Sequence, residues 1–248
     1  MAVLRTEGLR KSFGEMRAVD GVDFVVGDQQ LVALVGSNGA GKTTLVNLIS
    51  GLLMPDAGTV RFGEREVTSL SPYDRIKAGI ARSFQIVNLF DALTTLDNIR
   101  LTIFARDGKV RKAFEFAEHD GDVRAEAEEV LAAFGLADKR DLLAGGLAQG
   151  ERKLLDVAVA YALRPQLILL DEPTSGVGTR EKSTIMDTIS GVVRSRGLSA
   201  VIVEHDMDVV FRYSDRIFMM HEGRVFAEGT PHEIRQDKRV AATLLGQT

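Results

Sequence analysis

Residues 36–44 have the residue types and spacing of a phosphate-binding loop. They read GSNGAGKTT and match the pattern G-x-x-x-x-G-K-[ST] at every fixed position. Glycines in such a loop let backbone N–H groups turn inward around phosphate oxygens without a Cβ clash. Lys42 adds a mobile positive charge, and the Thr43 hydroxyl can ligate Mg²⁺. A chance glycine-rich turn is the weaker interpretation, because a strand-like run precedes the loop and a helical pattern follows it. The residues expected to bind the nucleotide here are Gly36, Ser37, Asn38, Gly39, Ala40, Gly41, Lys42, Thr43 and Thr44.

Two carboxylates, Asp171 and Glu172, follow the apolar run at residues 167–170. Ligands of open α/β sheets lie at the carboxyl ends of the strands. An Asp there can hold Mg²⁺ through water, and the neighbouring Glu can accept a proton from an attacking water. Such a pair on its own more often belongs to a solvated loop. The phosphate-binding loop upstream reverses that preference and favours a hydrolytic site.

Gln85 and His205 also follow apolar runs, at residues 80–84 and 200–203. Both would emerge at the sheet edge that carries the phosphate-binding loop. Gln85 could reach a γ-phosphate through Mg²⁺ or water, and His205 could donate a hydrogen bond to it. On spacing alone, a polar turn residue is an equally good interpretation of each.

The elements that must position these side chains alternate between strands and helices. The expected strands cover residues 3–6, 22–26, 31–35, 80–84, 167–170, 200–203 and 217–220, with a turn near Gly14, and the expected helices include residues 42–50, 180–194 and 207–213. Alternation of this kind indicates a mainly parallel sheet that is covered on both faces.

The middle of the sequence differs, because residues 91–162 contain no convincing strand. An acidic amphipathic helix is expected at residues 124–134, and a second helix at 151–163 is ended by Pro165. We interpret residues 91–163 as a helical lobe inserted between two strands of a single domain that covers residues 1–248.

Composition narrows the possible functions. The 248 residues carry a net charge of −4, which gives no electrostatic reason to expect nucleic acid as a partner. The absence of cysteine excludes disulfides and thiolate metal sites. No run approaches the roughly 20 apolar residues of a membrane span, and the charged start is unlike a signal peptide. Work at a membrane would therefore require docking on an embedded partner.

Taken together, these motifs resemble the nucleotide-binding subunits of ABC transporters over nearly the whole chain and in the expected order. The matching features are residues 36–44 (Walker A loop), Gln85 (Q-loop), residues 147–151 (the family signature, here LAQGE), residues 167–172 (Walker B), His205 (switch histidine) and Phe13 (adenine-stacking aromatic). A P-loop kinase or GTPase would not carry the signature and the histidine together.

The resemblance implies a fold: an α/β P-loop NTPase core with a mainly parallel sheet, an antiparallel β subdomain and an inserted α-helical lobe. It also implies an ATPase that uses ATP and Mg²⁺. Glu172 would be the general base, and His205 would hold the γ-phosphate and the attacking water. The implied catalytic residues are Glu172, His205, Gln85 and Lys42, and the implied metal ligands are Thr43 and Gln85, with Asp171 nearby.

The resemblance further implies partners. Two ATPase subunits, identical or different, would pair head to tail, so that Ala148, Gln149 and Gly150 of one chain cover the ATP of the other. Membrane-spanning permease subunits would dock near Leu89 and Phe90, although burial of these two residues in the helical lobe is an equal alternative. A solute-binding protein would act indirectly. The implied location is the cytoplasmic side, peripheral on the inner face of the cell membrane.

Within the family, residues 147–151, residues 203–208 and the tail sequence EGTPHEI are most similar to importer ATPases for branched-chain amino acids. Three positions depart from the usual family pattern. Ala148 and Gln149 replace Ser and Gly of the signature, and Gly178 replaces an Asp. Two alternatives are a non-transport ABC ATPase acting on ribosomes or DNA, and a regulatory nucleotide-binding module. The single domain argues against the first, and retention of a general base argues against the second.

Overall fold

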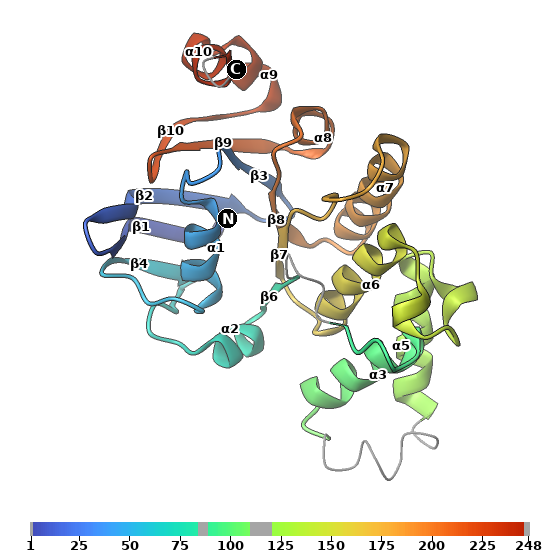
Figure 1. Cartoon of the computed structure of the whole chain (residues 1–248). Coiled ribbons are helices and arrows are strands. Elements are labelled where there is room, and N and C mark those ends of the chain that lie inside the picture. The colour runs from blue at the N-terminus through green and yellow to red at the C-terminus, as the bar shows by residue number, and fades with distance from the viewer. Residues whose placement is uncertain (1, 84–88, 110–120, 246–248) are drawn as a thin grey trace.

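Most of the predicted strands join one six-stranded sheet (Figure 1). The computed structural model describes residues 2–83, 89–109 and 121–245. The strands of this sheet are β3 (Leu31–Gly36), β6 (Ile80–Arg82), β7 (Leu167–Asp171), β8 (Ser199–Val203), β9 (Arg216–His221) and β10 (Arg224–Gly229). Their order is β10-β9-β3-β8-β7-β6, and all neighbours are parallel except β10, which pairs antiparallel with β9. The mainly parallel sheet is therefore confirmed. Phe84, the last residue of the expected strand 80–84, lies outside the described residues.

A second sheet is antiparallel and contains β1 (Ala2–Phe13), β2 (Met16–Gly27), β4 (Ala57–Phe62) and β5 (Arg65–Glu66), in the order β2-β1-β4-β5. β1 and β2 form a long hairpin whose turn contains Gly14 at a φ of 60°. The expected strands at residues 3–6 and 22–26 are too short, because the strand segments beside the turn are largely exposed and lack an apolar pattern. The antiparallel β subdomain is confirmed.

The core lies on both faces of the six-stranded sheet, because side chains alternate along its strands. On β3, Leu31, Ala33 and Val35 belong to one buried cluster, whereas Val32 and Leu34 belong to another. The second cluster includes the antiparallel sheet and α1 (Lys42–Ser50), whose bounds are those expected from the sequence. Figure 1 shows α1 beside the antiparallel sheet and the remaining large helices on the other side of the six strands.

Between β6 and β7 the described chain is helical. This region contains α3 (Thr95–Arg106), α5 (Gly121–Ala133), α6 (Gln149–Ala162) and two short 3₁₀ turns, Ala137–Lys139 and Ala144–Gly146. Arg106 connects all three helices: its guanidinium pairs with Glu126 on α5 at 2.6 Å and donates to the carbonyl oxygen of Ala162, the last residue of α6, at 2.8 Å. The helices expected at residues 124–134 and 151–163 are thus present as α5 and α6, with shifted ends. The assignment of residues 1–248 to one domain stays a prediction.

The remaining helices are α2 (Pro72–Ala78), α7 (Thr179–Ser195), α8 (Met207–Tyr213), α9 (Pro231–Gln236) and α10 (Lys238–Leu245). α7 and α8 confirm the helices expected at residues 180–194 and 207–213. Arg75 of α2 is fully buried and donates to the carbonyl oxygens of Leu48 and Ile49 at 2.5 and 2.6 Å, so it caps the carboxyl end of α1. Burial lowers the pKa of Arg75 to about 10. Among the residues that the structure describes, no helix is long and apolar enough to cross a membrane.

Candidate active site

The phosphate-binding loop connects the end of β3 to the start of α1. Gly41, just before α1, has a φ of 99°, and a Cβ atom there would lie 2.1 Å from the carbonyl oxygen of Ala18. The loop is also held by the N–H group of Gly223, which donates to the carbonyl oxygen of Ala40 at 3.0 Å. Only glycine fits at position 41, and the loop is fixed against β2 and the turn between β9 and β10. Because α1 starts at Lys42, the positive end of its dipole borders the loop.

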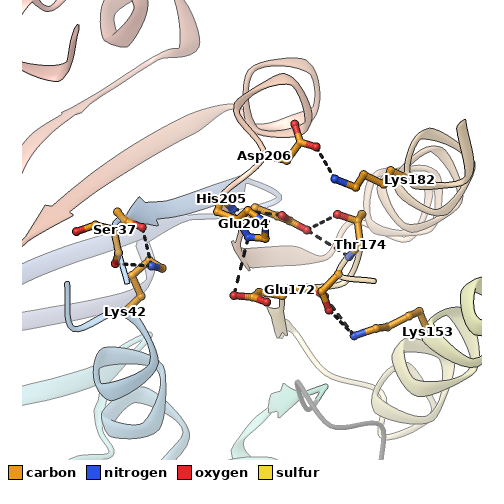
Figure 2. Close-up of polar contacts among 11 residues, drawn as sticks. Ser37, Lys42, Lys153, Glu172, Thr174, Lys182, Glu204, His205 and Asp206 are labelled. Atoms are coloured by element: carbon orange, nitrogen blue, oxygen red, sulfur yellow. Dashed lines mark hydrogen bonds and ion pairs between the residues drawn. The ribbon is translucent and has the colours of Figure 1, made fainter. Parts of the chain in front are cut away.

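Lys42 places a buried amine in the loop. Its Nζ donates to the carbonyl oxygens of Gly36 and Ser37 at 2.6 and 2.9 Å (Figure 2). Burial lowers the pKa of Lys42, and the negative charges of Glu172 and Asp171 act in the opposite direction. Both carboxylates lie about 130 positions further along the sequence, at the carboxyl end of β7, whereas Lys42 follows the carboxyl end of β3 in the same sheet. Thr43, the next residue of α1, is exposed.

Asp171, the last residue of β7, forms an ion pair that the sequence motifs did not indicate. Nη2 of Arg82, at the end of β6, lies 2.8 Å from Oδ2 of Asp171, and the side chains are 9% and 3% exposed. Nη1 of Arg82 also donates to Oδ1 of Asn47 at 2.5 Å and to Oγ of Ser50 at 3.5 Å. Arg82 therefore fixes the Asp171 carboxylate to the helix that follows the phosphate-binding loop.

Glu172 follows Asp171 in an unusual backbone conformation. Its φ is 49°, in the left-handed region that residues with a Cβ atom rarely adopt. Its N–H group donates to the carbonyl oxygen of Val203 at 3.0 Å. Its own carbonyl oxygen accepts from the N–H group of Ser175 at 3.1 Å and from Nζ of Lys153 at 3.3 Å. The residue proposed from the sequence as a general base therefore lies in a tightly bonded turn.

His205 lies beside this turn. Its Nδ1 is 4.0 Å from Oε1 of Glu172, and the imidazole is 62% exposed, so it can reach a ligand (Figure 2). The buried carboxylate of Glu204 joins the two loops: it accepts from the N–H and hydroxyl groups of Thr174 at 3.2 and 2.6 Å, and from the N–H group of His205 at 3.3 Å. The Glu204 carboxylate thus holds the loop after β7 and the loop after β8 together.

Asp206 fixes the chain directly after His205. Its carboxylate accepts from the N–H groups of Asp208 and Val209 at the start of α8, and it pairs with Nζ of Lys182 at 2.7 Å. The hydrogen bond from Lys182 holds the pKa of Asp206 below its usual value. This N-cap sets the direction in which α8 leaves the site.

Residues 147–151, the signature segment, begin α6 on the side of the sheet away from α1. Ala148 is exposed and caps α6 without a side-chain hydrogen bond; its N–H group donates to the Glu151 carboxylate at 2.9 Å. The side-chain amide of Gln149 lies against Gly176, and Gly150 lies against the Glu181 carboxylate. Gln149 and Gly150 therefore contact the segment after Glu172 in the same chain, whereas Ala148 contacts Glu151 within α6.

The remaining residues that the sequence predicts for the site differ in their exposure, and one of them lies outside the described residues. Phe13 ends β1 with 46% of its surface exposed, so its ring is available for stacking. Gln85 lies outside the described residues. Leu89 packs against the core of the helical lobe, whereas Phe90 is 59% exposed. Burial thus applies to Leu89, whereas docking of a permease at Phe90 stays a prediction.

The sequence reasoning missed Arg82, Lys153, Thr174 and Glu204. Glu204 lies in the segment 203–208 but was given no role there, and Arg82 lies three positions before Gln85. A charged residue inside or beside an apolar run was the available signal, because such a side chain needs a buried partner.

Comparisons with known proteins agree with this geometry. The family model described as ABC transporter matches residues 19–175. The high-affinity branched-chain amino acid transport ATP-binding protein of Pseudomonas aeruginosa is 30% identical, with 99% of this chain and 98% of the relative covered. The lipopolysaccharide export system ATP-binding protein of Haemophilus influenzae is 31% identical, with 100% and 98% covered. A solved ATP-binding cassette of an ABC transporter in its ADP conformation is 30% identical, covers 99% of both chains and has a TM-score of 0.87.

The sheet, the phosphate-binding loop and the acidic strand end define a P-loop ATPase that binds nucleotide. The chain belongs to the ABC transporter family and is an ATP-hydrolysing subunit of that family. A further solved cassette, bound to ADP and phosphate, is dimeric; it is 26% identical with a TM-score of 0.78, and 92% of this chain and 98% of that one are covered.

Proposed function

We propose that the chain hydrolyses Mg-ATP with Glu172 as the general base and that hydrolysis drives import of a small solute, with branched-chain amino acids as the favoured cargo. The observation that carries the catalytic part is that four side chains from distant parts of the sequence lie at or after the carboxyl ends of β3, β7 and β8 in the parallel part of one sheet. They are Lys42, Asp171, Glu172 and His205. The cargo rests on the similarity to branched-chain amino acid transport ATP-binding proteins.

Each side chain takes a role that its position allows. Lys42 binds the β- and γ-phosphates together with the N–H groups of the loop. Glu172 accepts a proton from the attacking water, and His205 donates a hydrogen bond to the γ-phosphate. The 4.0 Å between these two side chains leaves both within reach of one phosphate group.

The residues also fit Mg²⁺, which prefers hard oxygen ligands. The exposed Thr43 hydroxyl, the amide oxygen of Gln85 and the Asp171 carboxylate are such ligands. Because Arg82 already binds Oδ2 of Asp171, we favour contact of this carboxylate with the ion through water. Bound Mg²⁺ would neutralise charge on the phosphoryl oxygens during transfer.

Partners complete the proposal. Two ATPase subunits pair so that the signature segment of one covers the ATP of the other, with adenine stacked on Phe13. Permease subunits dock on an apolar surface formed by Phe90, Leu142 and Leu143, which are all at least 46% exposed. Residues 94 and 143 form a β-bridge, so these three side chains belong to adjacent segments. The chain would act as a single domain on the inner membrane face, with the solute-binding protein contacting the permeases only.

Replacement of Glu172 by Gln tests the catalytic assignment. Glu172→Gln should keep ATP affinity and lower turnover by about 10²-fold or more, the range for loss of a general base. Glu222→Gln is a matched control, because Glu222 also has a left-handed φ, 46°, and is exposed. Turnover of Glu172→Gln equal to that of the control would refute the assignment.

The cargo needs a separate experiment. The chain is co-purified with its membrane subunits and reconstituted into vesicles, and ATP-dependent uptake of leucine is measured. Uptake supports the import proposal. ATP-dependent extraction of lipopolysaccharide without leucine uptake would favour the activity named for the Haemophilus relative.

A further inference from the structure

Lys153, on the second turn of α6, contacts the turn that carries Glu172. Its side chain is buried, and its Nζ donates to the carbonyl oxygen of Glu172 at 3.3 Å and to Oγ of Ser175 at 3.0 Å. Figure 2 draws Glu172 between the amines of Lys42 and Lys153, with Lys153 bonded to the backbone of Glu172 and not to its carboxylate. The amine therefore holds Glu172 through its backbone.

The two hydrogen bonds of Lys153 reach the first and the last residue of the turn, Glu172 and Ser175. The N–H group of Ser175 donates to the same carbonyl oxygen of Glu172 that accepts from Lys153, so residues 172 and 175 are bonded to each other and to one ammonium group. On its other side, the N–H group of Glu172 is bonded to Val203 on β8. The left-handed backbone of Glu172 is thus fixed by β8 from one direction and by α6 from the other. Strained backbone conformations persist only where the surroundings over-determine them.

We propose that Lys153 is a positioning residue for ATP hydrolysis: its ammonium group holds the Glu172–Ser175 turn in the conformation that directs the Glu172 carboxylate to the attacking water. The inference rests on the proposed role of Glu172 as general base. Lys153 has no contact with the phosphate-binding loop among its hydrogen bonds in the described chain, so its effect falls on the chemical step and not on nucleotide affinity.

The test compares Lys153→Met, which keeps the length of the side chain and removes the ammonium group, in two backgrounds. In the wild-type background kcat should fall about 10- to 100-fold, the loss expected from slight misplacement of a catalytic group. The KM for ATP should stay within twofold. In a Glu172→Gln background, where the base is already lost, the same substitution should lower single-turnover hydrolysis less than twofold, because residues acting as one unit are not additive.

Arg106→Met is the matched control. It removes a cationic side chain that is bonded to the opposite end of α6, through the carbonyl oxygen of Ala162. It should lower the melting temperature and leave kcat of the folded protein within twofold of wild type. If Lys153→Met does not fold, Ser175→Ala replaces it; this substitution removes one acceptor of the ammonium group and should lower kcat about threefold to tenfold, again without a change in KM.

The outcomes are distinct. Equal losses in both backgrounds, a rise in KM without a fall in kcat, or no change in kcat would overturn the positioning role of Lys153. Full activity of Glu172→Gln itself would instead refute the proposed function, and it would do so before Lys153 is considered.

Discussion

Substitution of Arg82 by Met would leave the Asp171 carboxylate buried without its cationic partner. Both side chains are less than 10% exposed, so water cannot compensate for the lost charge, and breaking such a pair from one side costs about 3–5 kcal/mol. Lys42 lies near enough for its charge to interact with Asp171, which favours the lower half of this range. Loss of the hydrogen bond to Asn47 adds about 1 kcal/mol. We therefore expect Arg82→Met to lower the free energy of unfolding by about 4 kcal/mol.

The measurement is urea denaturation in EDTA without nucleotide, with the m-value checked for constancy. The control is a cycle with Asp171→Asn, which removes the negative charge and keeps the volume. The double variant should be more stable than the sum of the single losses predicts, by about 2 kcal/mol or more, because it leaves no buried unpaired charge. A loss below about 1 kcal/mol for Arg82→Met, or strict additivity in the cycle, would show that the ion pair does not hold Asp171 to α1.

Three further predictions concern nucleotide affinity, the pH dependence of stability and the capping of α1. Calorimetry should show that Lys42→Ala weakens ATP binding strongly, whereas Phe13→Ala weakens ATP and ADP alike by a modest stacking contribution; no effect of Phe13→Ala would remove it from the site. The pKa of Asp206 is lowered in the folded protein, so its contribution to stability is present above its unfolded pKa of about 3.9 and is lost as pH falls through the lower folded value. Unfolding measured over an acid pH series should show this loss of stability in the wild type and a smaller loss in Lys182→Met. Arg75→Met should cost about 3 kcal/mol or more in denaturation experiments, because it leaves several buried carbonyl oxygens without donors, and a loss under about 1 kcal/mol would contradict the capping role.

The parts of the site that could be predicted from the sequence are those set by local geometry. The phosphate-binding loop is a run of nine residues whose glycines, lysine and helix start act together, and α1 begins where the pattern placed it. Asp171 and Glu172 could be predicted because a strand end brings adjacent residues to the same sheet edge. The roles of the individual residues stay predictions, and that of Gln85 lies outside the described structure.

The contacts that hold these residues could not be predicted, because each joins segments that are distant in sequence. Arg82 and Asp171 are 89 positions apart, and Glu204 and Thr174 are 30 apart. No local pattern specifies such a pair, because it arises only when two parallel strands lie side by side. The strands β4 and β5 were missed for a related reason: their residues are mostly exposed or half-buried, so the alternation that marks a strand is weak.

The unusual signature segment is best understood from its packing within the chain. Gln149 stands where the family usually has glycine, and its amide occupies the space that a Cβ atom on Gly176 would need, 2.3 Å away. A larger side chain at position 149 is therefore accommodated by the missing side chain at position 176, whose φ of 79° also favours glycine. Ala148 and Gly178 affect the chain differently. Each precedes a helix without a side-chain cap, so a Ser and an Asp there would each add an N-cap bond. Gln149 is thus accommodated by Gly176, whereas Ala148 and Gly178 each leave a helix without an N-cap bond that would stabilise the chain.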